Sequence, residues 1–373
     1  MYFRLNPESL LTTGECGSII CDAFTNKIYH LNEYETKLIV HAENNNIVDE
    51  NEELYHTLKN ECLGKFYENI PYIIKIRTDS FLQRDIEFSF KKFYLELTDI
   101  CHESCDYCGF KNYSRSLGCI GCNSFNETGE YLSSEEFISI IDVISNLGCD
   151  ELYIRGGDLS LNMELSTQII NYAKDKIKDV FIILSYKHNY QKFLKIINHN
   201  IHMILQIDLD QINSNLLSSN NITYLVIVPE DKERLFHEKT NEFNELNFLP
   251  DFLTKDNAVN PNLNKNYHFD LISFYHNLEF HPCLGKTLFI SSKGNIFPCP
   301  MFRTCKIANI KNKDFMSVLS EIKNNILMIW KNNLDYINNC KDCEFRYICS
   351  DCRALEEKLS NSPNNKLLCE FNK

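Results

Sequence analysis

The segment from Phe93 to Cys108 constrains the fold more than any other part of the chain. Apolar and more polar side chains alternate from Phe93 to Thr98, and this period of two predicts a β-strand. Cys101, Cys105 and Cys108 follow at once, separated by three and then two residues. An iron–sulfur cluster normally takes four cysteines, so three thiolates leave one iron of a cubane open to another ligand. The alternative is a zinc site whose fourth ligand is missing from this segment.

The cysteine spacing resembles that of the radical S-adenosylmethionine (SAM) superfamily, which commonly has an aromatic residue, here Tyr107, before the last cysteine. The resemblance implies an α/β fold, a partial (β/α)6 TIM-like barrel. It also implies a 4Fe–4S cluster whose open iron binds the amino and carboxylate groups of SAM. Reductive cleavage of SAM would then give a 5′-deoxyadenosyl radical, and we expect Tyr107 to lie beside the cofactor.

Length and composition limit the other classes of protein. The 373 residues suffice for one large domain and one or two small ones. We find no run of 18 apolar residues and no signal peptide, so we expect a cytoplasmic protein without a membrane partner. The net charge of −13 argues against nucleic-acid binding, which relies on clustered Lys and Arg. Seventeen cysteines favour metal or cluster ligation in a reducing compartment.

Residues 1–90 are expected to form a small separate module. Ser18–Cys21 and Lys27–His30 are strand-like, Asn32 can cap the helix that follows it, and Glu52–Lys59 predicts a second helix. This order resembles the winged-helix module that precedes the barrel in many peptide-modifying enzymes. That module binds a leader peptide as an added strand at a sheet edge. The alternative is a plain N-terminal extension.

Residues 91–250 alternate between helix and strand patterns, which predicts an α/β barrel. Ser133 and Glu136 form a capping box ahead of an amphipathic helix. Strands are expected at Glu151–Arg155, Val180–Ser185, His202–Ile207, Ile222–Val228 and, more weakly, Phe243–Leu249. Helical segments are expected at Leu165–Lys176 and Tyr190–Ile197.

Three residues at the end of the second expected strand, Gly156, Gly157 and Asp158, form a candidate cofactor site. Glycines at a strand end let the backbone approach a ligand closely. In the radical SAM family a Gly-Gly-Glu segment at this point holds the amino group of SAM, and Asp158 would keep the carboxylate with a shorter reach. Ser185 and Gln206 lie at strand ends, where ligands of such barrels bind, and we expect both to contact the cofactor.

A second cysteine-rich region follows an expected linker at 251–282. Residues 283–373 resemble the SPASM domain of peptide- and protein-modifying enzymes through eight cysteines: Cys283, Cys299, Cys305, Cys340, Cys343, Cys349, Cys352 and Cys369. The family pattern usually has three residues in the last gap, where Cys349 and Cys352 have two between them. The alternative is a pair of zinc sites, but zinc ribbons separate their CxxC pairs by roughly 15–20 residues.

The resemblance also implies a ligand set. Cys340, Cys343, Cys349 and Cys369 would hold one auxiliary 4Fe–4S cluster. Cys283, Cys299 and Cys352 would hold another, with Cys305 as candidate fourth ligand. Without Cys305, that cluster would keep an open iron for a substrate thiolate. With the cluster on Cys101, Cys105 and Cys108, the chain would carry three clusters.

A further pair, Cys119 and Cys122, lies in the segment GCIGC. Such a pair can bind metal, form a redox dithiol, contact substrate or have no special role. The sequence assigns it none, and it identifies no catalytic acid or base.

Taken together, the resemblances imply a radical SAM maturase of a ribosomally made precursor peptide that carries a leader sequence. It would form a thioether or another intramolecular cross-link, with electrons from a flavodoxin or ferredoxin. The alternative enzyme is a sulfatase-maturing oxidase, which forms formylglycine. A zinc-bound, non-catalytic peptide-binding adaptor is the alternative outside enzymes.

Overall fold

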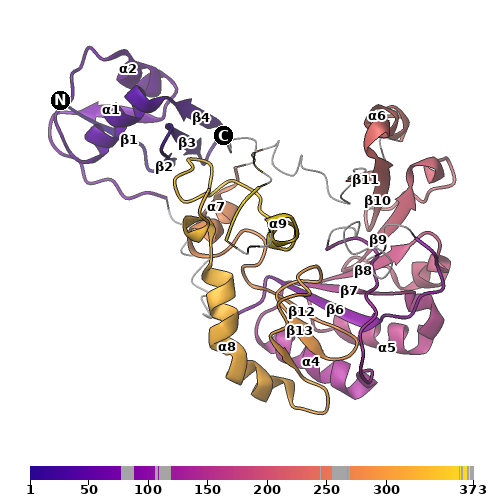
Figure 1. The fold of residues 1–373 in the computed structure, drawn as a ribbon. Helices are drawn as coiled ribbons and strands as arrows, with labels where there is room; N and C mark the ends of the chain where they lie inside the picture. Colours follow the sequence, from indigo (N-terminus) through magenta and orange to yellow (C-terminus); the bar gives the residue numbers. More distant parts are fainter. Residues whose placement is uncertain are drawn as a thin grey trace.

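The computed structural model describes residues 1–76, 88–105, 108, 119–243, 245–253, 267, 269–360, 362, 364–367 and 369. Figure 1 shows a lobe formed by the N-terminal elements, a large sheet flanked by helices, and a C-terminal region between the two. Tyr107, predicted to lie beside the cofactor, is outside the described residues, and so are residues 254–266 and 268 of the predicted linker.

A nine-stranded sheet forms the centre of the molecule, in the order β11-β10-β9-β8-β7-β6-β12-β13-β14. Its strands are β6 (Lys92–Thr98), β7 (Glu151–Gly156), β8 (Asp179–Ser185), β9 (Ile201–Asp208), β10 (Ile222–Pro229), β11 (Asn247–Leu253), β12 (Thr287–Ile290), β13 (Asn295–Phe297) and β14 (Ala308–Asn309). Strands β6 to β11 run parallel, β12 joins β6 in parallel, and β13 and β14 add antiparallel strands at the edge. The predicted α/β class with a large parallel sheet is confirmed.

Strand β11 begins later than the sequence predicts. The predicted strand started at Phe243, but the amides of Phe243 and Leu246 donate backbone hydrogen bonds to the carbonyls of Thr240 and Phe243. These local bonds form turns after helix α6 (Glu233–Thr240), so pairing with β10 begins only at Asn247.

Helices cover one face of the parallel sheet (Figure 1): α4 (Ser134–Asn146), α5 (Met163–Lys174) and α8 (Phe315–Lys331). Helix α4 starts at the predicted capping box, since the Ser133 and Glu136 side chains each accept from the other residue's backbone. Its apolar face, with Phe137 and Ile141, is buried in one core with Leu95 of β6 and Ile154 of β7. Short 3-10 helices η2 (Leu159–Asn162) and η3 (Tyr190–Ile196) complete this layer, and η3 replaces a predicted α-helix.

On the opposite face of the sheet, a row of aromatic side chains is followed, toward the carboxyl ends of the strands, by polar side chains. Tyr94 stacks on Tyr153, Tyr153 on Phe181 and Phe181 on His202, with ring centroids 4.8, 4.6 and 4.9 Å apart. Residues further along these strands are polar. In the strand register Glu96 of β6 lies beside Arg155 of β7, and Ser185 of β8 lies beside Gln206 of β9. The carboxyl ends of the parallel strands therefore bring polar side chains together at one edge, where ligands of α/β sheets bind.

The N-terminal lobe contains β1 (Tyr2–Leu5), β2 (Ser9–Thr13), β3 (Ser18–Asp22), β4 (Ile28–Leu31), α1 (Glu33–Glu43), α2 (Glu53–Asn60) and β5 (Gly64–Tyr67). β2, β3 and β4 form an antiparallel sheet, and β1 pairs with β5. The sequence predicts β3, β4 and both helices, including the Asn32 cap of α1, but it does not predict β1, β2 or β5.

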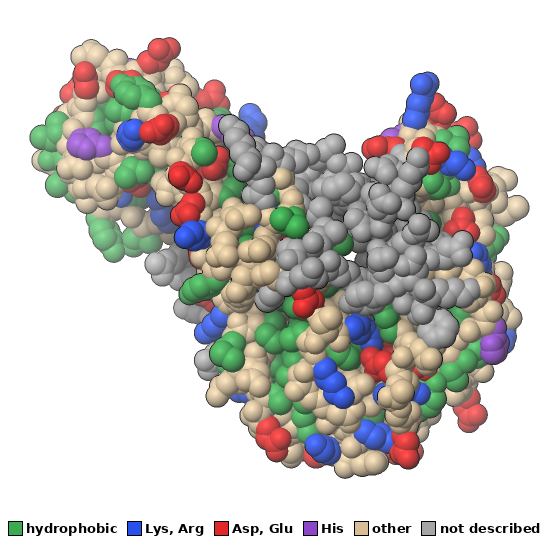
Figure 2. Space-filling view, viewed as in Figure 1, with side chains coloured by type: hydrophobic (Ala, Val, Ile, Leu, Met, Phe, Trp, Pro, Cys, Tyr) green, Lys and Arg blue, Asp and Glu red, His purple; other side chains and the backbone are tan. Residues whose placement is uncertain are grey.

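The lobe packs on the C-terminal region, which includes α7 (Leu271–Glu279) and α9 (Arg353–Ser360). Leu10, Ile19 and Cys21 share a buried apolar cluster with Phe269 and Phe345. In space-filling view the lobe projects from the rest of the molecule, and acidic and basic side chains are interspersed over the described part of that face (Figure 2). Of the helices described, none combines the length and the apolar character needed to cross a membrane.

Candidate functional site

A cavity of ≈ 230 Å³ lies where the parallel strands end. We call it the triad cavity, because Cys101, Cys105 and Cys108 all line it. Other lining residues come from distant parts of the chain: Asp99, Ile100, Glu103, Cys122, Ser124, Asn126, Tyr131, Gly157, Ser185, His188 and Gln206. The structure therefore brings the predicted triad together with three of the predicted cofactor contacts, Gly157, Ser185 and Gln206.

The glycines at the end of β7 allow the close approach of two chain segments. Gly156 has a φ of +156°, and a Cβ added to Gly157 would lie 2.1 Å from the carbonyl oxygen of Ile100. The Gly157 amide donates to the Thr98 carbonyl at 2.8 Å, and the Asp158 amide to that of Ile100 at 2.7 Å. The end of β7 thus fixes the backbone that leads into Cys101.

The carboxylate of Asp158 already has partners within the protein in this structure. Its carboxylate accepts from the Ser160 amide at 2.9 Å and so caps η2, and it lies 3.7 Å from Nδ1 of His188. Asp158 is not among the described residues that line the triad cavity. Its predicted contact with the amino group of SAM stays a prediction.

His188 and Lys187 are residues of the site that the sequence does not predict. His188 Nε2 lies 3.5 Å from the Cys101 sulfur, and its Nδ1 accepts from the Ser185 amide at 3.4 Å. Burial lowers the pKa of His188. Because Nδ1 accepts from the Ser185 amide, Nε2 is the ring nitrogen that can donate toward the sulfur. Lys187 Nζ lies 3.7 Å from the Cys105 sulfur. Two donors after β8 thus face two sulfurs of the triad.

Gln206 provides an unused donor on the cavity wall. Its side chain is buried, and Oε1 accepts from the Cys122 amide at 2.7 Å. Its Nε2 has no hydrogen-bond partner in the part of the chain that is described. A buried amide donor without a partner is costly, so a bound acceptor is expected there. Three thiols for a cluster, beside an unsatisfied donor, fit a cubane whose open iron binds a ligand with carboxylate or hydroxyl oxygens, as SAM has.

Arg155 holds the loop from Cys119 to Asn123, which we call the Cys119–Asn123 loop. The fully buried guanidinium donates to the carbonyls of Cys119 at 2.7 Å, Gly121 at 3.3 Å and Asn123 at 3.4 Å. Burial lowers the pKa of Arg155. The loop therefore lies over the polar end of the sheet, between the triad and the C-terminal cysteines.

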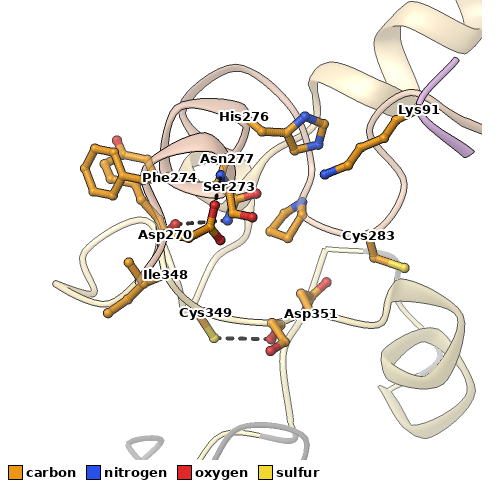
Figure 3. A pocket seen from close by; sticks show the side chains of 13 residues that line it. Lys91, Asp270, Ser273, Phe274, His276, Asn277, Cys283, Ile348, Cys349 and Asp351 are labelled. Atoms are coloured by element: carbon orange, nitrogen blue, oxygen red, sulfur yellow. Dashed lines mark hydrogen bonds between the residues drawn. The ribbon is translucent and has the colours of Figure 1, made fainter. Parts of the chain in front are cut away.

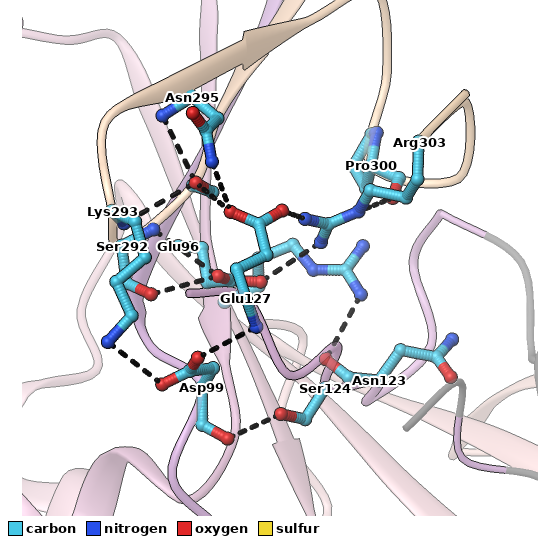
Figure 4. Close-up of polar contacts among 12 residues, drawn as sticks. Glu96, Asp99, Asn123, Ser124, Glu127, Ser292, Lys293, Asn295, Pro300 and Arg303 are labelled. Atoms are coloured by element: carbon cyan, nitrogen blue, oxygen red, sulfur yellow. Dashed lines mark hydrogen bonds and ion pairs between the residues drawn. The ribbon is translucent and has the colours of Figure 1, made fainter. Parts of the chain in front are cut away.

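A buried ion network joins β6 to the C-terminal region (Figure 4). Arg303 Nη2 donates to Glu96 Oε2 at 3.1 Å, and its Nη1 to Glu127 at 2.5 Å. Ser292 donates to the other oxygen of Glu96 through its amide at 3.2 Å and its hydroxyl at 3.0 Å. Breaking such a network leaves a buried charge uncompensated. Because Arg303 lies between Cys299 and Cys305 in the chain, it fixes their segment against the sheet.

One group of C-terminal thiols contains Cys340, Cys343, Cys349 and Cys369. Burial raises the pKa of Cys343 to about 11, and the charges of Cys349 and Cys369 add to the effect. Burial likewise raises the pKa of Cys340 to about 12, with a contribution from Cys349. The assignment of these four cysteines to one auxiliary cluster stays a prediction, and iron binding would displace their protons.

A buried polar network connects this group with the second one. Lys366 Nζ lies 3.4 Å from the Cys349 sulfur and 3.3 Å from Asp351. Burial alone would raise the pKa of Asp351, but hydrogen bonds from His281 and Arg353 hold that pKa well below its usual range. His281 Nε2 lies 2.9 Å from Asp351, while its Nδ1 accepts from the amide of Cys283 at 3.1 Å.

The second group contains Cys283, Cys299 and Cys352. Burial raises the pKa of Cys283 well above its usual range, and the charges of Cys352 and Cys299 contribute. Cys305 lies in the same apolar surroundings as Cys299. The pKa of Cys305 is raised by burial and then by Glu357, with no contribution from another described thiol. The assignment of Cys283, Cys299 and Cys352 to one cluster, with Cys305 as candidate fourth ligand, stays a prediction.

A second cavity of ≈ 230 Å³ separates α7 from the C-terminal cysteines, and Cys283, Cys349 and Asp351 line it together with Lys91 and His276 (Figure 3). Burial lowers the pKa of His276 to about 4. Within the described part of the chain, no group of three or more His, Cys, Asp or Glu side chains is arranged to hold a single metal ion.

Residues 283–344 match the family model of SPASM, an iron–sulfur cluster-binding domain, which confirms the resemblance predicted for this region. No curated protein matches the chain. Three solved structures of SuiB from Streptococcus suis are similar to it, each at 15% identity over 100% of the SuiB chain. The match to SuiB bound to SAM covers 99% of this chain with a TM-score of 0.46. The match to SuiB alone covers 98% of this chain with a TM-score of 0.48. SuiB bound to the precursor peptide SuiA covers 99% with 0.50, so the chain shares its fold.

Proposed function

We propose that this protein is a radical SAM enzyme that modifies a ribosomally made precursor peptide. The observation that carries the proposal is the triad cavity at the carboxyl ends of parallel strands, which is lined by three thiols and by Gln206, whose Nε2 has no partner among the described residues. The SPASM match beside this cavity and the fold shared with SuiB support it. We infer that Cys101, Cys105 and Cys108 hold a 4Fe–4S cluster and that Gly157, Ser185 and Gln206 contact SAM.

The side chains around the triad orient and protect this site. When bound, the cluster and SAM would supply a 5′-deoxyadenosyl radical that removes a hydrogen atom from the peptide. His188 and Lys187 direct N–H groups at two of the sulfurs, and such hydrogen bonds raise the reduction potential of a cluster. Gln206 orients the cofactor through its amide. Ser185, His188 and Gln206 form a buried part of the cavity wall, which limits the access of water to a reactive intermediate.

We further propose that the C-terminal thiols hold two auxiliary 4Fe–4S clusters, one on Cys340, Cys343, Cys349 and Cys369 and one that includes Cys283, Cys299 and Cys352. These clusters would accept the second electron of an oxidative cross-link, and the product would be a thioether or another intramolecular cross-link. A cytoplasmic flavodoxin or ferredoxin would supply the first electron. The network of His281, Asp351 and Lys366 supports this assignment, because buried charges are placed beside the sulfurs.

The N-terminal lobe is proposed to bind the leader of the precursor peptide. Its antiparallel sheet has β2 and β4 as edge strands, and an edge strand can accept a peptide as an added strand. SuiB, whose fold the chain shares, has been crystallised with its precursor peptide SuiA. In this proposal residues 1–90 act as a winged-helix-like recognition module for residues 91–250 and 283–373.

The test replaces Cys101, Cys105 and Cys108 with Ala in one variant and measures iron and 5′-deoxyadenosine anaerobically, with dithionite and SAM. Deoxyadenosine formation should be abolished, while about eight irons should remain on the two auxiliary clusters. Cys16→Ser is the matched control, because Cys16 is exposed and lies far from the triad in the chain. Persistent deoxyadenosine formation in the triple variant would overturn the proposal.

A further inference from the structure

A cavity of ≈ 680 Å³, which we call the open cavity, lies beside the triad cavity. The segment from Phe125 to Glu130 lines one side of it, and the other side is lined by β13, β14 and the chain that flanks them. Asn126 lines both cavities, so the two adjoin at this residue. The open cavity therefore leads to the place where the three thiols of the triad meet.

The charged side chains of the open cavity are mostly cationic. Among the described residues that line it, four are basic and two are acidic: Lys293, Arg303, Lys306, Lys311, Glu127 and Glu130. Arg303 donates to Glu127 and Glu96, and Lys311 donates to Glu136 at 2.9 Å. The charges of Arg303 and Lys311 are thus compensated by protein carboxylates at hydrogen-bond distance, which is not so for Lys293 and Lys306.

Lys293 is a buried cation in the wall between the two cavities. Its side chain is 6% exposed, and its ammonium lies 3.7 Å from Asp99 and over the ring of Tyr131, two residues of the triad cavity (Figure 4). A separation of 3.7 Å is too long for a hydrogen bond, and the described residues offer this ammonium no other acceptor. A buried charge is costly unless it is both paired and hydrogen-bonded, so a further acceptor is expected beside Lys293.

Lys306 places a second ammonium group in the open cavity. It is exposed, and no ion pair or hydrogen bond joins its side chain to the described part of the protein. Glu130, on the facing segment, is also exposed, so water screens its charge. Lysine ammonium groups donate up to three hydrogen bonds and accept none, which makes a carboxylate a suitable ligand for this pair of lysines.

We propose that the open cavity binds a carboxylate group of the substrate peptide at Lys293 and Lys306, while neighbouring residues of the peptide pass Asn126 into the triad cavity. The inference rests on the proposed function, because it takes the peptide as the occupant. The peptide can present this group as an Asp or Glu side chain or as its C-terminus. The predicted SAM contacts Gly157, Ser185 and Gln206 do not line the open cavity, so the carboxylate site is separate from them.

The experiment measures how far a peptide protects Lys306 of the reconstituted, anaerobic full-length protein from acetylation by N-hydroxysulfosuccinimide acetate. The probe is acetyl-Gly-Gly-Glu-Gly-Gly-amide, with saturating SAM present. The same peptide with Gln in place of Glu lacks the carboxylate, and the Gln peptide with a free C-terminus carries one at its end. Mass spectrometry quantifies acetylation at Lys306 and at the exposed Lys341, the internal control.

We expect the Glu peptide, the free C-terminus or both to protect Lys306 and not Lys341. With a Kd on the order of 1 mM, about 5 mM peptide should slow acetylation of Lys306 about sixfold. Protection by only one of the two peptides identifies the source of the carboxylate. Lys293→Met should abolish the protection, Lys293→Arg should keep it, and Lys341→Met is the control variant.

Equal protection by the Gln amide peptide, or none by any peptide, would overturn the proposal. So would protection that disappears when SAM is added, because the peptide would then occupy the place of SAM. Iron content and circular dichroism show whether Lys293→Met is folded, and undiminished protection in the folded variant would also contradict the proposal. The proposed function fails separately, if the wild-type protein forms no deoxyadenosine.

Discussion

At the scale of single residues, the site is defined by buried polar groups whose partners lie far away in the sequence. Gln206 accepts one hydrogen bond from the Cys122 amide, and its buried Nε2 has no partner among the described residues. Lys366 is almost fully buried beside the Cys349 sulfur. Both are polar groups that a core would not retain without a role, because an unsatisfied or charged buried group costs stability.

Gln206→Met should weaken SAM binding. The substitution removes one hydrogen bond to the cofactor, worth about 0.5–1.5 kcal/mol, so the Kd should rise roughly two- to tenfold while iron content is unchanged. An equilibrium binding experiment with SAM and the anaerobic protein measures this Kd. Gln168→Met, at an exposed position of α5, is the control. An unchanged Kd in Gln206→Met would show that the amide does not contact SAM.

Lys366→Met should lower the reduction potential of the auxiliary cluster next to it. The ammonium group stabilises the extra negative charge of the reduced cluster, and losing a charged hydrogen bond should shift the midpoint by on the order of 50 mV. Redox titration followed by EPR provides the value. The exposed Lys341, next to Cys340 in the chain, gives the control variant Lys341→Met. A potential equal to or above that of the wild type contradicts the assignment of Cys349 as a ligand.

At the scale of elements, the end of β7 positions the triad. Gly157 lies so close to the Ile100 carbonyl that any side chain would push the segment before Cys101 away. Strands β6 and β7 approach each other closely here, because the Gly157 amide donates to the last carbonyl of β6, that of Thr98, and the Asp158 amide donates to the Ile100 carbonyl just after it. The strand end therefore acts as a template for the cysteine loop.

Gly157→Ala should reduce deoxyadenosine formation about a hundredfold, since displacing a catalytic group by roughly 1 Å costs about that much. Iron on the auxiliary clusters should be unaffected, and total iron should fall by at most about four. Gly148→Ala is the control for backbone strain away from the triad: its φ of +70° disfavours a side chain, but no atom lies within 4 Å of the added Cβ. Wild-type deoxyadenosine formation in Gly157→Ala would mean that β7 does not position the triad.

The strands and helices that could be predicted are those with a local signal. The alternation in β6, the apolar runs of β8 to β10 and the capping boxes at Asn32 and Ser133 depend only on neighbouring residues. The role of Glu96 in a buried ion pair could not be predicted from the sequence, because its partner Arg303 lies 207 residues further along the chain. Cys119 had no predicted role for the same reason, since the thiols around it belong to the C-terminal region.

At the scale of the whole molecule, the N-terminal lobe and the C-terminal region share a core. Leu10, Ile19 and Cys21 of the lobe are buried together with Phe269 and Phe345. Arg346 Nη1 also donates to the Thr13 carbonyl at 2.7 Å, and the Glu15 amide to that of Asp342 at 2.8 Å. A lobe that binds the leader would thus be attached directly to the segment that carries Cys340, Cys343 and Cys349.

Ile19→Ala should loosen this junction. Removing a fully buried side chain of this size costs about 2–5 kcal/mol, so the lobe should be released by a protease or by heat before the rest unfolds. Limited proteolysis with mass spectrometry identifies the fragment, and SAM cleavage without peptide should persist. The exposed Ile47 gives the control Ile47→Ala. Wild-type protection of the lobe in Ile19→Ala would contradict a shared core.

The most direct measurement is the content of iron, sulfide and zinc of the anaerobic wild-type protein, followed by the 5′-deoxyadenosine assay with dithionite and SAM. A three-cluster radical SAM enzyme should contain about twelve irons, four for each cubane, and form deoxyadenosine. Zinc in place of iron, with no deoxyadenosine, would contradict this account and identify the chain as a metal-bound protein that binds peptides without modifying them.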